Sequence, residues 1–584
     1  MVASRVAMFR RVRQAFGGAT GFLFESRASW VDLVLLAAVG GAIFGLTRVS
    51  AQWTGALRPV VDIDLSPSAL PGYALYSLCR GLAAYALSLA FTLVYGYWAA
   101  KDAVAERVLI PTLDILQSIP VLGFMPGLVL ALVAAFPRSN VGLELASVLM
   151  IFTGQVWNMT FSFYHSLRTV PRDFQEVATL ARFSWWQRLR WVDLPFATIG
   201  LVWNSMMSMA GGWFFLMVSE AFVLGDRSFQ LPGLGSYMSV AVARGDKAAM
   251  AAAVGAMVAM IVALDQLLWR PVVVWAQKFR ADEGGQAAEM ESWFLDLLTR
   301  SRILGWLHEW AGRRGARRPA HPQRPPSDGA TGGGRAARIA SLAMFSLLLG
   351  SMALGSVGLV RLLARVPGPA WRGIGAASML TLGRVLLAVA VGTLWTVPAG
   401  IAIGLSPRLS RALQPVVQVV ASFPAPMLFP AVVAVLSAAG VGLGWGSVVL
   451  MLLGTQWYVL FNVIAGAVAI PADLREAAHA YRLGLWQRLW SLYLPAVFPY
   501  LVTGWVTAAG GAWNASIVSE YVSFRGRELV ADGLGARISE AAAAGDFPVL
   551  AAAIAVMAIL VVLFNRLVWR RLHHLAELRF SLTR

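Results

Sequence analysis

The segment from Val170 to Pro195 reads VPRDFQEVATLARFSWWQRLRWVDLP, and a related segment begins 300 residues later, at position 470. The second copy, residues 470–495, reads IPADLREAAHAYRLGLWQRLWSLYLP. Both keep a glutamate, an alanine, an arginine, a Trp-Gln-Arg-Leu run and a final Leu-Pro. Self-similarity at a fixed offset is typical of a repeated structural unit. A charged segment that recurs inside two apolar halves indicates a membrane protein that presents one kind of surface twice to a soluble partner.

The composition is typical of a membrane protein. Hydrophobic residues make up 58% of the chain and charged residues 13%, whereas soluble globular proteins average about 25% charged residues. The mean hydropathy is +0.66, and 23 Trp with 29 Phe fit aromatic belts at two membrane interfaces. The net charge of +18 does not indicate a nucleic-acid partner, because the arginines lie between apolar stretches, where positive charge orients membrane proteins.

The sequence contains no motif for metal or nucleotide binding. The chain has a single cysteine, Cys79, and its six histidines show no ligand spacing such as HExxH. No GxxxxGK[ST] phosphate-binding loop is present. We therefore predict no metal site and no cofactor bound by this chain, which has to take free energy from a partner.

Apolar stretches long enough to cross about 30 Å of hydrocarbon predict an all-α polytopic protein. These stretches do not alternate between apolar and polar residues, so helices are predicted rather than barrel strands. The predicted count is about twelve, six in each half. The first six are 30–48, 73–99, 108–135, 141–165, 196–222 and 248–275, and the second six are 338–363, 377–404, 412–438, 442–468, 495–521 and 547–570.

The similarity between the halves extends well beyond the charged segment. At the same 300-residue offset Glu220 corresponds to Glu520, and a Gly-Leu-Gly run at 233–235 corresponds to 533–535. Upstream the offset is 304, so that Arg80 corresponds to Arg384. Because each unit has an even number of predicted spans, the copies point the same way and form a tandem repeat rather than an inverted one.

The predicted domains are residues 1–279, a middle segment 280–336 and residues 337–584. Within the middle segment, 289–310 has apolar residues at near-helical spacing, which favours an amphipathic helix on the membrane surface or a partner. Residues 313–335 read as a flexible basic linker. The basic segments fall on one side of the membrane if the spans alternate, which predicts cytoplasmic termini and cytoplasmic charged segments. The N-terminal basic stretch is interpreted as preceding an uncleaved helix.

Each repeated segment resembles the EAA loop of ABC importer permeases, in which Glu-Ala-Ala is followed by a glycine and then by Leu-Pro. The Trp-Gln-Arg after it is similar to the nitrate, sulfonate and taurine branch of that family. The resemblance covers nearly the whole chain and implies two fused type I permease bundles in the bacterial inner membrane. It also implies import of a small solute from periplasm to cytoplasm by alternating access, with an anion such as nitrate, a sulfonate or a taurine-like compound favoured. The implied partners are membrane lipid, two ABC ATPase subunits that hold ATP-Mg, and a periplasmic or lipid-anchored substrate-binding protein. The chain itself is then no enzyme.

In that family the loop forms a short coupling helix that inserts into a groove of the ATPase. By resemblance the docking residues are Glu176, Ala178, Arg182, Trp186 and Arg188, with Glu476, Ala477, Ala478, Arg482, Trp486 and Arg488. The alternative is an ordinary loop that merely connects two spans. The sequence departs from the family at Arg182 and Arg482, where glycine is usual, so we expect a different turn or an arginine contact with ATPase carboxylates.

Charged residues at corresponding positions of the two halves lie inside predicted spans, namely Arg80 and Arg384, and Glu220 and Glu520. A buried arginine is costly and is usually functional or paired. Two interpretations stay open for the arginines, namely an anion-attracting ring, or snorkelling and structural pairing with Glu220 or Glu520.

Polar residues of the fourth and fifth spans are candidates for the translocation path: Thr153, Gln155, Asn158, Asn204, Ser208, Gln456, Asn462, Asn514 and Ser516. The alternative is hydrogen bonding between helices. The halves differ here, since Asn514 corresponds to Phe214 and Ser516 to Leu216. We therefore expect an asymmetric path, with Phe214 or Phe215 as a wall or gate.

Two other functions compete with the importer. A secondary transporter driven by an ion gradient predicts several charged residues at mid-membrane, and this sequence has few. A membrane scaffold or sensor without transport gives no reason for two matching charged loops.

Overall fold

The computed structural model describes residues 30–224, 227–279, 292–301, 343, 346, 350, 353–524 and 527–580. The chain divides into two compact units, the smaller comprising residues 1–51 with 287–335 and the larger comprising 52–286 with 336–584. In the smaller unit, α2 (Trp30–Thr54) begins near Asp32, a buried residue whose carboxylate accepts a 2.7 Å hydrogen bond from Ser301. The predicted amphipathic helix is described only as α14 (Trp293–Thr299), and the predicted linker lies outside the described residues.

Both halves of the repeat lie in the larger unit and have the same order of elements. The first half contains α3 (Leu70–Phe91), α4 (Tyr97–Lys101), α5 (Ala103–Ser118), α6 (Met125–Ala135), α7 (Val141–Arg168), α8 (Arg172–Leu180), α9 (Trp185–Arg188), α10 (Leu194–Glu220), α11 (Leu234–Arg244), α12 (Lys247–Leu264) and α13 (Arg270–Ala276). The second half contains α17 (Gly368–Leu405), α18 (Pro407–Ser422), α19 (Phe429–Ala438), α20 (Leu443–Val468), α21 (Ala472–Ala480), α22 (Leu485–Arg488), α23 (Leu494–Ser519), α24 (Leu534–Ala544), α25 (Phe547–Phe564) and α26 (Arg570–Phe580).

The prediction of an all-α polytopic membrane protein is confirmed. Among the described residues, eight helices are long and apolar enough to cross a membrane, or up to ten if each of two bent pairs counts as one span. The 28-residue α7 is long enough but is not among them, because Glu144, Gln155 and Asn158 dilute its apolar content. The predicted span 338–363 lies partly outside the described residues, which include the apolar helix Ala353–Leu363.

The third predicted span of each half is broken rather than continuous. The helices on either side of the break are bent by 83° in the first half and by 81° in the second. Each break lies at a proline, Pro120 or Pro424, and the residues before these prolines, Ile119 and Phe423, are extended. Proline disfavours the helical conformation of the residue before it, which accounts for the break.

The broken spans interlock the two halves of the larger unit. α18 of the second half packs on α10 and α12 of the first, and α5 of the first half packs on α25 of the second. Within each half long helices pack together, α7 with α10 in the first half and α20 with both α17 and α23 in the second. A single apolar core therefore includes residues of both halves, among them Trp213 and Trp513, each 3% exposed or less.

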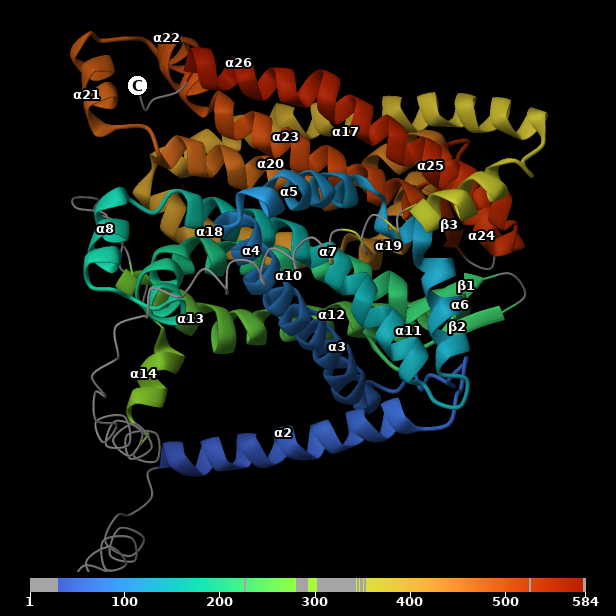
Figure 1. Ribbon diagram of the computed structural model, residues 1–584. Coiled ribbons are helices and arrows are strands. Elements are labelled where there is room, and N and C mark those ends of the chain that lie inside the picture. The colour runs from blue at the N-terminus through green and yellow to red at the C-terminus, as the bar shows by residue number, and fades with distance from the viewer. Residues whose placement is uncertain are drawn as a thin grey trace, which may run out of the picture. The chain divides into compact units, whose positions relative to one another are not determined.

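A small β-hairpin follows the fifth span in each half, which the sequence did not predict. β1 (Ala221–Leu224) pairs antiparallel with β2 (Arg227–Gln230), and β3 (Tyr521–Phe524) pairs with β4 (Arg527–Val530). Figure 1 shows the hairpins at the opposite end of the larger unit from α8, α21 and α22. The repeated charged segments of both halves are therefore presented together at one end.

Candidate functional site

Each repeated charged segment folds into two short helices joined by a tight turn. In the first copy the turn joins α8 to α9, and in the second it joins α21 to α22. The backbone N–H groups of Phe183 and Leu483 donate to the carbonyls of Ala178 and Ala478, at 2.9 and 3.1 Å. The N–H groups of the preceding arginines donate to the carbonyls of Thr179 and His479. This bond pattern is a Schellman motif, which ends a helix with one residue in the left-handed conformation.

That left-handed residue is an arginine in both copies. Arg182 has φ 51° and Arg482 has φ 50°, and they are the only non-glycine residues with positive φ in the described part of the chain. A non-glycine residue in this conformation costs on the order of 1 kcal/mol. The different turn that we expected is therefore not formed, because both arginines adopt the conformation that favours glycine. Their side chains are exposed.

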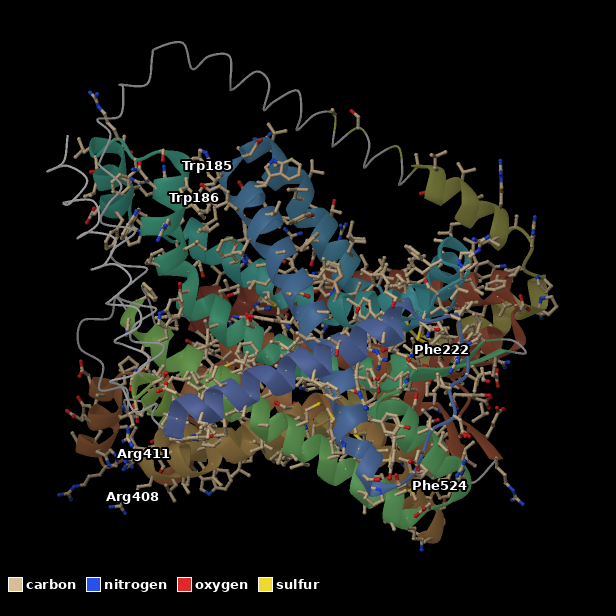
Figure 2. The ribbon with its side chains drawn as sticks, turned by 90° about the horizontal axis from the view of Figure 1, so that it is seen from below. Trp185, Trp186, Phe222, Arg408, Arg411 and Phe524 are labelled. Carbon is tan, nitrogen blue, oxygen red and sulfur yellow. The ribbon has the colours of Figure 1, made fainter. Side chains whose placement is uncertain are left out.

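The loops expose large apolar side chains together with charge. Trp186 is 54% exposed and Trp486 is 74% exposed, and Glu176, Glu476 and Ala477 are exposed beside them. Figure 2 shows Trp185 and Trp186 at the end of the molecule away from Phe222 and Phe524. Large exposed aromatic side chains surrounded by charged residues are typical of a surface that binds another protein.

Some residues that we expected at the docking surface instead support the turns. Ala178 and Ala478 are buried, so their roles are packing and acceptance of the turn hydrogen bonds. Arg488 is half-buried, and its Nε donates to the carbonyl of Leu483 at 2.7 Å. Arg188 is also half-buried, and its Nη2 lies 3.4 Å from Oε1 of Gln175. These two arginines connect the two short helices of each loop.

A cavity of about 250 Å³ lies between the two halves of the larger unit. Of the predicted path residues, Thr153, Asn158, Phe214, Phe215 and Asn514 line it. Polar residues that the sequence analysis missed also line it, namely Gln117, Gln418, Ser422, Thr455, Tyr458, Thr507 and Asn565. No Asp, Glu, Lys or Arg among the described residues lines this cavity. The space suits a small polar solute held by neutral donors and acceptors.

The remaining predicted path residues bond to helices and do not line the cavity. Gln155 is buried near Ser88 and Met209, and Asn204 donates to Ser162 at 2.9 Å. Trp395 donates to Gln456 at 2.9 Å. Ser208 is an exception, since it is buried without a hydrogen-bond partner among the described residues, whereas Asn462 and Ser516 donate to carbonyls of their own helices. For these residues the geometry favours the alternative of structural hydrogen bonding.

Asn514 connects the cavity wall to the break of the other half. Its Oδ1 accepts a 2.8 Å hydrogen bond from the backbone N–H of Val121, directly after Pro120. Breaking a helix leaves such N–H groups without an intrahelical partner, and each is costly if left unpaired in hydrocarbon. The corresponding residue, Phe214, lines the cavity without such a bond and packs edge-on against Phe215. The cavity wall therefore differs between the two halves at this position.

Comparison with known families agrees with this architecture. Residues 92–268 and 396–574 each match the family described as "Binding-protein-dependent transport system inner membrane component", and together they make up more than half of the chain. The chain belongs to this family. It carries two fused copies of the permease domain, and each copy includes one Schellman-turned loop and one broken span.

Curated relatives of the permease match over part of their length. The nitrate import permease protein NrtB of Synechocystis sp. is 26% identical over 26% of this chain and 53% of its own length. The taurine transport system permease protein TauC of Escherichia coli is 28% identical over 32% of this chain and 64% of its own. The bicarbonate transport system permease protein CmpB of Synechocystis sp. is 26% identical over 25% and 50%. The chain thus spans between half and two thirds of these relatives.

The permease buries its first intramembrane arginine completely between two carboxylates. Arg80 donates from Nε and Nη2 to the two oxygens of Glu144, at 2.6 and 2.8 Å. Its Nη1 donates to Glu220 at 2.8 Å and to the carbonyl of Pro232 at 2.9 Å. These side chains are at most 1% exposed. The pairing favours the structural interpretation of Arg80, and Glu144 is a partner that the sequence analysis missed.

The Gly-Leu-Gly runs of the permease surround Glu220 and Glu520, the glutamates that the two halves share. Gly235 and Gly535 donate from their backbone N–H groups to Glu220 and Glu520, at 2.7 and 2.8 Å. A β-carbon added at Gly233 would collide with the carboxylate of Glu220. Glycine is thus required where the backbone approaches the buried carboxylate closely. The repeat of this run, noticed in the sequence, has a packing cause.

Proposed function

We propose that this chain is the transmembrane subunit of an ATP-driven importer, with two permease domains in one polypeptide. The observation that carries the proposal is the pair of equivalent loops, which share one turn geometry and lie at one end of the larger unit. A loop that merely joined two spans has no reason to keep a strained arginine and an exposed tryptophan in both copies. The proposed docking side chains are Glu176, Arg182 and Trp186 with their counterparts Glu476, Arg482 and Trp486.

Each loop is proposed to receive one ABC ATPase subunit in the cytoplasm. The exposed tryptophans supply apolar anchors, and the glutamates and turn arginines supply charge pairing with the ATPase surface. Closure of the two ATPases on ATP would move the loops together and shift the bundles between inward-facing and outward-facing states. ATP-Mg resides on the partners, and this chain performs no chemistry.

The transported solute is proposed to be small and polar and to cross through the cavity between the halves. The relatives are permeases for nitrate, taurine and bicarbonate, which favours a small anion. The described cavity wall offers amide, hydroxyl and indole groups without a fixed charge, so hydrogen bonding would replace the solute's water. A binding protein on the periplasmic side would deliver the solute, with the chain in the inner membrane and its termini in the cytoplasm.

The test is a charge reversal of both loops, Glu176→Lys with Glu476→Lys. Uptake driven by ATP is expected to fall at least tenfold, and the ATPase is expected to be lost on co-purification, while the permease itself stays monodisperse. A matched control is Glu540→Lys on α24, a partly exposed glutamate that forms a surface ion pair with Arg537 at the hairpin end of the larger unit. Normal uptake and full ATPase retention in the double variant would contradict the proposal.

A further inference from the structure

The two halves hold their intramembrane arginines differently. Arg80 uses Nε, Nη1 and Nη2 in hydrogen bonds within the protein. Arg384 donates from Nη1 to Glu520 and to the carbonyl of Asp532, both at 2.8 Å, and from Nε to the carbonyl of Gly444 at 3.1 Å. Its Nη2 makes no hydrogen bond to the residues that the structure describes. A guanidinium in the second half therefore keeps one donor edge unused.

One sequence position explains this difference. Glu144 lies in the first turns of α7, and the residue 300 positions later, in the first turn of α20, is Gly444. A β-carbon built on Gly444 would lie 3.8 Å from Nη2 of Arg384 and within 4 Å of no other described atom. The carboxylate that Glu144 supplies to Arg80 in the first half thus has no counterpart at this position of the second half.

The second arginine is also less covered. The Arg384 side chain is 14% exposed, compared with 1% for Arg80. In the first half the segment 55–66 packs over the start of α7, where Arg58 N–H donates to Asn140 at 2.8 Å. In the second half only residues 364–367 separate the helix Ala353–Leu363 from α17, so no equivalent segment lies there. Arg384 is therefore within reach of a ligand from outside the chain.

We propose that Arg384 and the open position beside Gly444 form a binding site for one small oxyanion. The first half shows the arrangement that we expect, because there Arg80 binds the carboxylate of Glu144 in addition to that of Glu220. A bound oxyanion would accept a hydrogen bond from Nη2 of Arg384 and would compete with the Gly444 carbonyl for the hydrogen bond from Nε. The start of the 26-residue α20 has no side-chain cap, and its macrodipole adds positive potential beside the site.

The ligand chemistry is a carboxylate, nitrate or similar oxyanion, or the phosphate of a phospholipid headgroup. The site lies by the hairpin end of the larger unit, since Arg384 bonds Asp532 between β4 and α24. It is separate from the central cavity, whose lining does not include Arg384 or Gly444. The inference therefore does not depend on the proposed transport function.

The experiment compares the purified full chain with two variants at this position. Gly444→Glu supplies the carboxylate from the chain, and Gly444→Ala, the matched control, leaves the space open. Thermal unfolding in detergent is followed as acetate or nitrate replaces chloride at constant ionic strength, and native mass spectrometry records the phospholipids retained. Gly444→Leu blocks the site without adding a charge, so the comparison holds even if Gly444→Glu does not fold.

We expect acetate or nitrate to raise the Tm of the natural chain and of Gly444→Ala by about 2 °C or more, with saturation. Gly444→Glu and Gly444→Leu should show no such rise. If there is no anion effect but the natural chain and Gly444→Ala retain an anionic phospholipid that both blocked variants lose, the ligand is the lipid phosphate. The same anion response and the same lipid content in all variants would overturn the proposal.

Discussion

Asn514 of the second half accepts a hydrogen bond from the backbone N–H of Val121 in the first half, at 2.8 Å. The bond joins a cavity-lining side chain to the break at which the third span of the first half bends by 83°. A side chain in this position has two effects, because it supplies polar surface to the cavity and fixes the break of the opposite half.

Asn514→Leu is expected to impair uptake more than Phe214→Leu. Leucine removes the acceptor and leaves the Val121 N–H unpaired, which costs about 1 to 3 kcal/mol. Phe214 makes only apolar contacts, so leucine retains most of them. Uptake into vesicles, with the binding protein present and equal amounts of assembled ATPase, is the measurement. An equal or opposite order of the two variants would show that the bond to Val121 has no role in transport.

At the turn positions 182 and 482 we expect glycine to be tolerated better than a β-branched residue. Arg182→Gly with Arg482→Gly should keep the turn, because glycine adopts positive φ without strain, so that ATPase binding falls only by the lost charge pairing, about fivefold or less. Arg182→Val with Arg482→Val should weaken binding at least tenfold, because a β-branched residue is strongly disfavoured in that conformation. Titration of the ATPase onto detergent-purified permease measures both affinities. Equal weakening of ATPase binding in the glycine and valine variants would contradict this account of the turn.

Much of the architecture was predictable because it depends on residue type and on the spacing of residues along the chain. The tandem repeat, the all-α membrane fold and the exposed loops follow from apolar runs and from one segment that occurs twice. The partner Glu144 was not predictable from the repeat, since its counterpart is Gly444 and the pairing with Arg80 joins residues 64 positions apart. The predicted path residues Gln155 and Asn204 do not line the cavity, because their side-chain amides form hydrogen bonds with neighbouring helices. Residue type alone does not distinguish these two roles.

Removal of the first-half carboxylate should be far more damaging than a change at its counterpart. Glu144→Ala leaves Arg80 buried with half of its donors unpaired, which is expected to cost about 3 to 5 kcal/mol of unfolding free energy. Gly444→Ala should change stability by less than about 1 kcal/mol, since its β-carbon would make only an ordinary van der Waals contact with Nη2 of Arg384, at 3.8 Å. Thermal unfolding in detergent compares them. Similar Tm values for the two variants would mean that Arg80 does not need Glu144.

Separation of the halves should leave a working permease. The two halves interlock through α18 and α5, so their assembly does not rely on the segment between them. Cutting the chain near Gly332 and co-expressing the two fragments should preserve at least half of the uptake. Failure of well-expressed fragments to co-purify would show that the segment 280–336 is more than a tether.

The number of ATPase subunits held by one chain tests the central claim most directly. Native mass spectrometry of the purified complex should give two ATPases for each permease chain. With Glu176→Lys alone, or with Glu476→Lys alone, the dominant species should carry one, because each loop receives one subunit. A natural complex with a single ATPase, or two retained ATPases when both loops are reversed, would contradict the account.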